Sequence, residues 1–257
     1  MKLTVLAENT ACREDLLAEH GLSLYMETGA YRILFDMGQT DAFARNAQTL
    51  GIDLSQVDFA VLSHGHYDHG GGLETFLRIN SKAPVYVHQR AFDEHYNGTR
   101  KYIGLDPSLK ENDRIVFTEG CRQLAPGITL QDCGRENWCF DACGLMEKHA
   151  EVFLPDSFAH EQYLEVTEGE KRFLFSGCSH RGIRNIARHF STDVLVGGFH
   201  LNKVEDMETL CKIGNDLRAI NGRYYTGHCT GNAQFDCLQE VMGHRLQKLS
   251  TGTVIEE

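Results

Sequence analysis

Residues 57–72 read VDFAVLSHGHYDHGGG, and this stretch decides the fold. An apolar run typical of a buried strand leads directly into six residues that hold three histidines and one aspartate. The glycines that follow let the backbone turn tightly. Such a turn can present His64 and His66 to one metal ion and Asp68 and His69 to a second, because imidazole and carboxylate groups are good ligands for Zn²⁺ and similar ions. A histidine-rich surface loop is the plainer alternative, and four ligand-type side chains at the end of a buried strand disfavour it.

The composition is that of a globular protein with no excess of basic residues. The chain has 257 residues, 42% hydrophobic, with a formal net charge of -11, which argues against non-specific nucleic-acid binding. The apolar run at the N-terminus is too short for a signal peptide, and no stretch approaches the ~20 apolar residues that cross a bilayer. Nine cysteines, an odd number with irregular spacing, favour free thiols in a reducing compartment. We therefore expect a cytoplasmic protein that does not bind membranes.

Short strand patterns alternate with helical patterns along most of the chain. Expected strands cover residues 3–9, 22–28, 31–37, 57–63, 84–89, 163–167, 172–176, 193–199 and 223–227, and expected helices cover 40–50, 73–79, 183–189, 204–220 and 236–249. Residues 90–150 are less regular. The pattern favours two sheets packed face to face with helices outside, although another α/β layering fits it nearly as well.

One turn cannot complete a site for two metals, and further metal-capable side chains lie at predicted strand ends. These are His160 before the strand at 163–167, Cys178 and His180 after 172–176, His200 after 193–199, and His228 after 223–227. Strand ends are where α/β folds gather functional groups. A single histidine there is most often structural, but the repeated occurrence favours a shared site.

Five segments that hold these residues match a known family in order. They are ILFDMGQ (33–39), LSHGHYDHGGGL (62–73), SGCSHRGIRN (176–185), GGFHL (197–201) and GHCTG (227–231). The second contains the HxHxDH signature, and together the segments resemble the metallo-β-lactamase superfamily. Within it they resemble the branch that includes 7,8-dihydropterin-6-methyl-4-(β-D-ribofuranosyl)-aminobenzene-5'-phosphate synthase. The resemblance implies a single α/β domain over residues 1–257, an αββα four-layer sandwich, with an irregular insert or lid at about 90–150.

The resemblance also implies a ligand set for two divalent metal ions. It assigns His64, His66 and His160 to one metal, Asp68, His69 and His228 to the other, and Cys178 to the position where most members place a bridging Asp. A thiolate is a poorer bridge than a carboxylate between two hard cations. His180 therefore remains an alternative ligand to Cys178.

Three further residues receive roles around the metals. Asp36 matches a residue that supports the site from behind by accepting the free N–H of a ligand histidine. A turn-forming Asp before Gly38 is an equal alternative. Glu8 and Asn9 follow the first strand and are expected to line the substrate pocket.

The implied chemistry is hydrolysis of a small phosphoester or ester by a metal-activated water. Asp68 would orient the nucleophile, and His200 or His180 would donate a proton to the leaving group or hold an anionic substrate oxygen. One alternative is a dihydropterin-type synthase that releases diphosphate. Another is a non-catalytic metal-binding sensor domain.

Zinc is the expected metal, with manganese or iron as alternatives. His66 stands where the related flavodiiron proteins carry Glu, and an imidazole favours zinc over a redox iron pair. The expected partner is a small molecule, with a phosphorylated one and homo-oligomer formation as open alternatives. Cys121, Cys133, Cys139 and Cys143 lack a CxxC pair, so free thiols are favoured over a second metal cluster.

Overall fold

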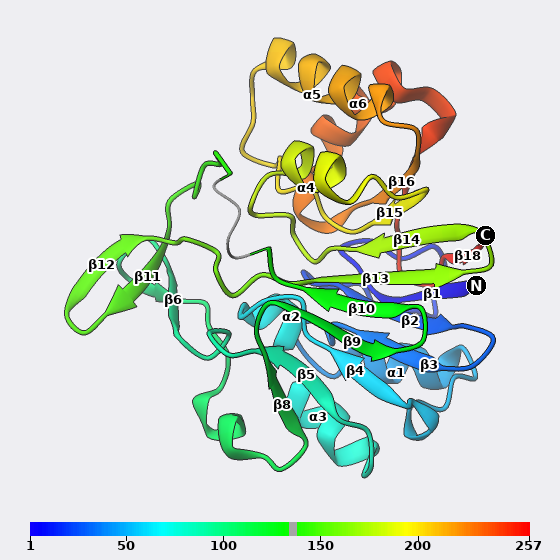
Figure 1. Ribbon diagram of the computed structural model, residues 1–257, viewed down its shortest axis with the longest axis vertical. Coiled ribbons are helices and arrows are strands. Elements are labelled where there is room, and N and C mark those ends of the chain that lie inside the picture. The colour runs from blue at the N-terminus through cyan, green and yellow to red at the C-terminus, as the bar shows by residue number, and fades with distance from the viewer. Residues whose placement is uncertain (134–137) are drawn as a thin grey trace.

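The computed structural model describes residues 1–133 and 138–257, and two seven-stranded sheets face each other at its centre. Figure 1 shows helices α4, α5 and α6 on the outer side of one sheet and α1 and α3 on the outer side of the other. This is the αββα four-layer arrangement that the sequence predicts, with both sheets buried between helices.

The first sheet has the strand order β18-β1-β2-β3-β4-β5-β8. Its strands are β1 (Lys2–Ala7), β2 (Ser23–Glu27), β3 (Arg32–Phe35), β4 (Phe59–Val61), β5 (Val85–His88), β8 (Ile115–Thr118) and β18 (Val254–Glu256), and it is covered by α1 (Ala42–Thr49) and α3 (Leu73–Ile79). The alternation of side chains along β3 shows how the layers form. Ile33 and Phe35 point into the core between the sheets, whereas Leu34 packs in the cluster under the helices.

The second sheet has the order β17-β16-β15-β14-β13-β10-β9. Its strands are β9 (Cys121–Ala125), β10 (Ile128–Gln131), β13 (Tyr163–Glu168), β14 (Lys171–Phe175), β15 (Val194–Val196), β16 (Arg223–Thr226) and β17 (Leu246–Lys248), and its helices are α4 (Ile183–Phe190), α5 (Met207–Ala219) and α6 (Asn232–Met242). Phe175 on β14 meets Phe35 on β3 with ring centroids 6.0 Å apart, so the two inner faces share one core.

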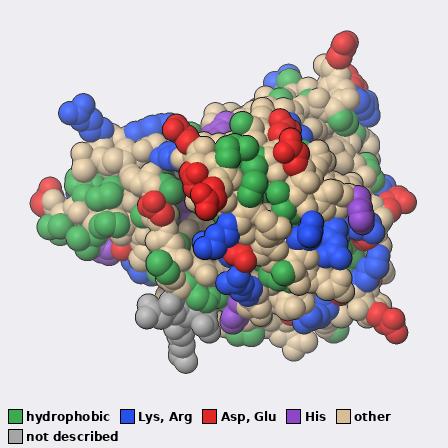
Figure 2. Space-filling view, turned by 90° about the horizontal axis from the view of Figure 1, so that it is seen from above, with side chains coloured by type: hydrophobic (Ala, Val, Ile, Leu, Met, Phe, Trp, Pro, Cys, Tyr) green, Lys and Arg blue, Asp and Glu red, His purple; other side chains and the backbone are tan. Residues whose placement is uncertain are grey.

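The region around residues 90–150, expected to be irregular, contains six short strands among its described residues. β8 belongs to the first sheet, and β9 and β10 belong to the second. A third sheet, which we call the arm, has the order β12-β11-β6-β7 and consists of β6 (Glu94–Asn97), β7 (Lys101–Tyr102), β11 (Leu145–His149) and β12 (Val152–Pro155). The arm projects to the left in Figure 1, and Figure 2 shows hydrophobic side chains on its surface, where Val152 and Leu154 are exposed.

Several predicted boundaries differ from the structure, and two of these differences bear on the site or on how a helix ends. The last helix, expected over 236–249, ends at Met242, because Gly243 takes a positive φ of 59° and β17 follows shortly after. The strand expected over 57–63 is shorter and ends at Val61, so a short loop separates it from His64 and His66. No helix in the described part of the chain is long and apolar enough to cross a lipid bilayer.

Candidate metal centre

Except for His160, which precedes β13, the metal-capable side chains named above are carried by the loops that follow β4, β14, β15 and β16. These strands run parallel to at least one neighbour in their sheets, so their carboxyl ends gather these loops at one edge of the sandwich. After β4 a short loop leads to α2 (Tyr67–Gly70), whose N-cap is His66 and whose first turn holds Asp68 and His69. Gly65 allows this turn, since a Cβ there would lie 2.1 Å from the carbonyl oxygen of Ala91.

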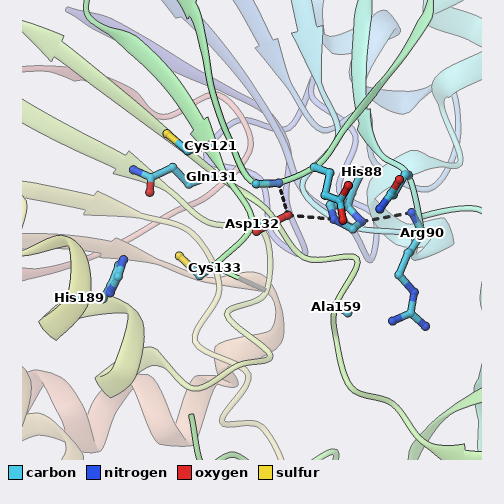
Figure 3. Close-up of a pocket in the computed structure, with 11 residues that line it drawn as sticks. His88, Arg90, Cys121, Gln131, Asp132, Cys133, Ala159 and His189 are labelled. Atoms are coloured by element: carbon cyan, nitrogen blue, oxygen red, sulfur yellow. Dashed lines mark hydrogen bonds and ion pairs between the residues drawn. The ribbon is translucent and has the colours of Figure 1, made fainter. Parts of the chain in front are cut away.

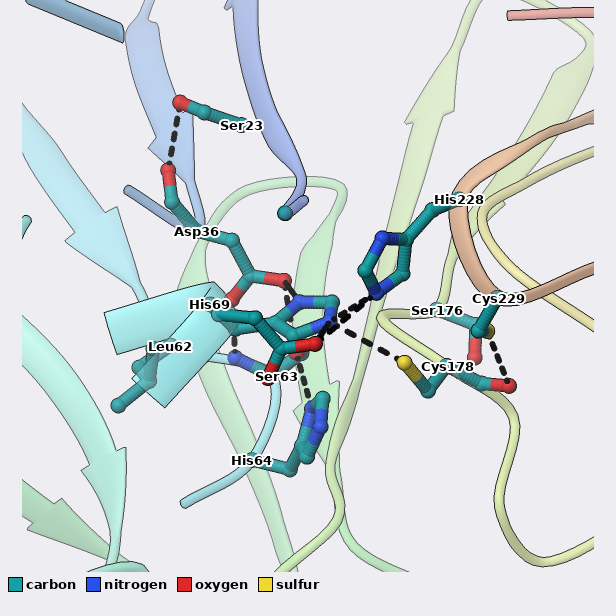
Figure 4. Close-up of polar contacts among 12 residues, drawn as sticks. Ser23, Asp36, Leu62, Ser63, His64, His69, Ser176, Cys178, His228 and Cys229 are labelled. Atoms are coloured by element: carbon teal, nitrogen blue, oxygen red, sulfur yellow. Dashed lines mark hydrogen bonds and ion pairs between the residues drawn. The ribbon is translucent and has the colours of Figure 1, made fainter. Parts of the chain in front are cut away.

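Asp36 fixes the ring protons of two histidines in this turn (Figure 4). Its Oδ2 accepts from Nδ1 of His69 at 2.6 Å and from the hydroxyl of Ser63 at 2.7 Å. Because Ser63 donates to Asp36, its oxygen accepts from Nδ1 of His64 at 2.8 Å. Both rings therefore carry their proton on Nδ1 and keep a lone pair on Nε2. The contact that the resemblance assigns to Asp36 is present in the structure.

Asn9 orients His228 in the same way from the other sheet. Its amide nitrogen donates to the backbone oxygen of His228, and its Oδ1 accepts from the backbone N–H of Gly21, which fixes the amide. Nδ1 of His228 then donates to Oδ1 of Asn9 at 3.0 Å, and Nε2 keeps the lone pair. Glu8 accepts from the backbone N–H of His228. Sequence analysis expects Glu8 and Asn9 to line the substrate pocket; in the structure both bond to His228 and line a cavity of about 150 Å³ beside it.

Side-chain atoms that can bind a metal converge from several elements at the centre of Figure 4. Nε2 of His69 lies 3.1 Å from Nε2 of His228 and 3.1 Å from Sγ of Cys178, and Oδ2 of Asp68 lies 3.2 Å from Nε2 of His228. A thiol proton on Cys178 can satisfy one of these atoms. The others remain acceptors that face each other in a buried place, an arrangement that a cation stabilises and that is costly without one. The donor set therefore fits a divalent metal ion.

A second set of imidazoles lies beside the first. The ring centroids of His64, His66 and His180 are 4.6 to 4.9 Å apart. Nε2 of His64, Nε2 of His66 and both nitrogens of His180 are buried and have no hydrogen-bond partner within the described residues. Burial and then the surrounding histidines hold the pKa of each ring well below its usual range, so the rings are neutral and can bind a metal.

Cys178 lies between the two sets. Ligand atoms of His64, Cys178 and His180 lie within 4.8 Å of one another, and so do those of His69, Cys178 and His228. Burial raises the pKa of the Cys178 thiol well above its usual range, so its deprotonation requires a cation beside it. The geometry therefore places Cys178 within reach of both ligand sets, and it brings His180 into the site as well.

His160 differs from the other predicted ligands. The backbone N–H of Gly65 donates to Nδ1 of His160 at 2.9 Å, and Nε2 of His160 faces Oδ2 of Asp156 at 3.4 Å. Both ring nitrogens are thus engaged inside the protein. Neither Asp156 nor His95, which also contacts Asp156, stood out in the sequence, because neither belongs to a motif or follows a predicted strand.

The family profile described as the metallo-beta-lactamase superfamily matches residues 17–210. The chain belongs to the metallo-β-lactamase superfamily. An uncharacterized protein of Methanocaldococcus jannaschii is 30% identical over 240 residues, covering 89% of this chain and 90% of the relative. The 7,8-dihydropterin-6-methyl-4-(β-D-ribofuranosyl)-aminobenzene-5'-phosphate synthase of the same organism is 26% identical, covering 100% of this chain and 96% of the synthase.

Solved structures agree with the superfamily assignment. The crystal structure of Tm1679, described as a metal-dependent hydrolase of the β-lactamase superfamily, has a TM-score of 0.86 and 29% identity, and the match covers 100% of this chain and 99% of Tm1679. The metallo-β-lactamase fold protein YhfI from Bacillus subtilis shares the fold, with a TM-score of 0.62, 14% identity and coverage of 100% and 99%.

The centre lies beside two cavities. A cavity of about 150 Å³ is lined by His66, Asp68, Cys178 and His180. A second cavity of about 540 Å³ also contains His180, and both include His200 and Lys203. The ring nitrogens of His200 are buried without partners among the described side chains, and its ring centroid lies 4.2 Å from that of His180.

The largest cavity, about 720 Å³, contains none of these side chains (Figure 3). Its walls include His88, whose Nε2 lies 3.2 Å from Oδ2 of Asp132.

The four cysteines considered for a separate metal cluster are Cys121, Cys133, Cys139 and Cys143. Within the described ranges, none of them belongs to a group of side chains close enough together to bind a metal.

Proposed function

We propose that this member of the superfamily is a metal-dependent hydrolase that uses a metal-activated water on a small phosphoester or ester. The observation that carries the proposal is the convergence of unprotonated ligand atoms from His69, His228 and Asp68 at distances of 3.1 to 3.2 Å. The match to Tm1679, 29% identical over the whole chain, supports hydrolysis as the class of reaction.

In this proposal two divalent ions, with zinc preferred, occupy neighbouring positions. His64, His66 and His180 hold the first ion, Asp68, His69 and His228 hold the second, and Cys178 stands between them. His180 takes the position that the resemblance gives to His160, because His180 has free ring nitrogens and His160 does not. Nitrogen-rich ligand sets of this kind favour zinc, while manganese and iron are alternatives.

When bound, the ions would supply a water of lowered pKa and polarise the substrate oxygen that is attacked. The protein's own residues do the remaining work. Oδ2 of Asp68 lies beside His228 of the second ligand set and accepts from Nε2 of His20 at 3.3 Å. Asp68 can therefore hold and orient a water molecule. His200 faces both cavities and can donate a proton to the leaving group.

The two cavities, which share His180, His200 and Lys203 in their walls, suit a small molecule rather than a polymer. Their volumes, about 150 and 540 Å³, together lie in the range of sites for metabolite-sized ligands. Lys101 and Lys203 line the smaller cavity, so a phosphorylated substrate is compatible with its charge. Phe140, Ile183 and Phe199 line the larger one and can pack against an apolar part of the substrate.

A synthase is the second candidate. It is favoured by the match to the M. jannaschii dihydropterin-type synthase along the full chain. In that case the same ions would hold a diphosphate leaving group, and turnover would require a second organic substrate. A non-catalytic sensor is the third candidate, and it predicts metal binding without turnover.

Purified protein tests these candidates. We expect close to two zinc ions per chain by elemental analysis and hydrolysis of at least one generic phosphodiester, lactone or thioester without a second organic substrate. His69→Asn should lose both properties, whereas His244→Asn, at an exposed position, should keep them. Absence of stoichiometric metal from the wild-type protein would overturn the proposal, and turnover only with two organic substrates would favour the synthase.

A further inference from the structure

A buried chain of hydrogen bonds links the arm to the metal turn. Asp156, directly after β12, is 2% exposed, and its Oδ2 lies 2.9 Å from Nδ1 of His95 on β6 and 3.4 Å from Nε2 of His160. His160 in turn accepts the backbone N–H of Gly65 at 2.9 Å. His95 and His160 are each 1% exposed, and their ring centroids are 3.9 Å apart. The chain thus spans from one arm strand to the peptide between His64 and His66.

These side chains, with His66, are close enough together to resemble a metal site. The hydrogen bonds of His160, however, argue against its binding a metal. Because Gly65 donates to Nδ1 of His160, the neutral ring must carry its proton on Nε2, where it is directed at Asp156. The same carboxylate accepts the Nδ1 proton of His95. The carboxylate of Asp156 therefore lies between two N–H donors and is satisfied without a cation. Nε2 of His95 is buried without a partner among the described residues, but both ring nitrogens of His160 are bonded inside the protein.

The chain acts on the backbone that carries the first two metal ligands. Gly65 lies between His64 and His66, so an acceptor at its N–H fixes the peptide plane between His64 and Gly65, one residue before His66. The segment after His160 holds the same strand end, since the backbone N–H of Gln162 donates to the carbonyl of Ser63 at 2.8 Å. A ligand turn held at these points is preorganised for metal binding, and such outer contacts typically change metal affinity 10–100-fold.

We propose that His160 is a positioning residue and not a metal ligand, and that His95 and Asp156 hold it in the tautomer that supports the Gly65 peptide. The inference rests on the metal centre proposed above. It departs from the ligand role that the superfamily resemblance assigns to His160. It also gives the arm a function, because β6 and the end of β12 supply the groups that fix the tautomer.

Two substitutions at one position distinguish a positioning role from a ligand role. In His160→Asn the side-chain oxygen can still accept from the Gly65 N–H, whereas in His160→Leu no acceptor remains. We expect the Asn variant to bind Zn²⁺ within about threefold of the wild type and the Leu variant about 10–100-fold more weakly. X-ray absorption of the zinc-loaded Asn variant should count as many imidazole ligands as the wild type, and His180→Asn should lose one.

The outcomes separate this inference from the proposed function. If wild-type protein binds no Zn²⁺, the metal centre itself is wrong. If the wild type binds two ions but His160→Asn loses one, with one imidazole fewer by X-ray absorption, His160 is a ligand and the inference is wrong. His160→Asn decides the question even if His160→Leu does not fold, and circular dichroism of the metal-free proteins shows which variants are folded.

Discussion

Nε2 of His69 and Nε2 of His228 lie 3.1 Å apart, and the hydrogen bonds of both rings place their protons on the opposite nitrogens. The two rings come from opposite sheets and are held from behind by Asp36 and Asn9. When both rings are neutral, the two buried lone pairs repel each other at this distance, and a cation between them is coordinated by both. The relationship therefore yields predictions about the protein with and without metal.

Replacing His228 should have a small effect on the metal-free protein and a large effect on its response to zinc. In metal-free protein, His228→Leu removes an acceptor that faces Asp68 and His69 but also removes one of the two donors to Oδ1 of Asn9. The loss of that hydrogen bond costs about 1 kcal/mol, so the melting temperature should change by only a few degrees. With zinc at about 100 times the wild-type Kd, the wild type should gain about 2.7 kcal/mol, and the variant under about 0.5 kcal/mol. Calorimetric melts with and without zinc measure both effects. His244→Leu should behave as the wild type, and an undiminished zinc response in His228→Leu would contradict the assignment.

Asn9 should affect metal affinity without contacting the metal. Asn9→Ala removes the acceptor for Nδ1–H of His228, so the ring can rotate and its tautomer is no longer fixed. We expect the Kd for Zn²⁺ to rise about 10–100-fold, measured by competition with a chromophoric chelator. Asn202→Ala, in the wall of the smaller cavity, serves as the control and should leave zinc affinity unchanged. An unaltered affinity in Asn9→Ala would show that the ring is positioned by other contacts.

The sequence predicts most elements of the two large sheets because their apolar runs are buried and bounded by turns. The helix expected over 73–79 matches α3 (Leu73–Ile79), and the strand pair expected over 163–176 matches β13 and β14. The arm was missed. β7 (Lys101–Tyr102) has only two residues, and β12 (Val152–Pro155) is a short apolar run at an exposed sheet edge, so the pairing of both strands depends on partners elsewhere in the chain.

The metal-capable residues are predictable from strand ends, but their roles are not. His160 and His180 both appear in the sequence beside a predicted strand. Only the structure shows that the backbone N–H of Gly65 donates to Nδ1 of His160, while both ring nitrogens of His180 have no hydrogen-bond partner among the described residues. Such differences depend on which backbone groups lie nearby in space. Asp156 and His95 escape sequence reasoning for the same reason.

Cys178 should influence which metal is preferred. It lies within reach of both ligand sets, and a thiolate favours soft ions, whereas a carboxylate is a better bridge between hard ions. Cys178→Asp should therefore lower the ratio of the Mn²⁺ Kd to the Zn²⁺ Kd by about tenfold. Titration of metal-free protein with each ion measures the ratio. Cys237→Asp is unsuitable as a control because it buries a charge, so Cys12→Ser, at an exposed position, is the matched variant. A ratio that stays constant would place Cys178 outside the coordination of both ions.

The stability of metal-free protein should be greatest near pH 6.5 and fall on both sides. Burial, first among the causes, lowers the pKa of His64, His66 and His180 well below the usual 6.5, and lowers that of His160 to about 4. Between about pH 4 and 6.5 the unfolded chain therefore binds more protons, and each group lowers the free energy of unfolding by up to about 1.4 kcal/mol per pH unit as the pH falls.

His69 acts in the opposite direction and above this window. Burial opposes its protonation, but Asp36 raises its pKa above 6.5, so the stability it contributes is complete below pH 6.5 and is lost as the pH rises through the folded value. Urea unfolding of chelator-treated protein at half-unit steps from pH 5 to 8.5 measures both limbs. His180→Asn should flatten the acidic limb, because one fewer neutral ring is forced to remain unprotonated, while leaving the alkaline limb in place. Stability that rises steadily from pH 6.5 to pH 5 would mean that these rings are charged in the folded protein, and neutral ligand sets could not then account for the arrangement around Cys178.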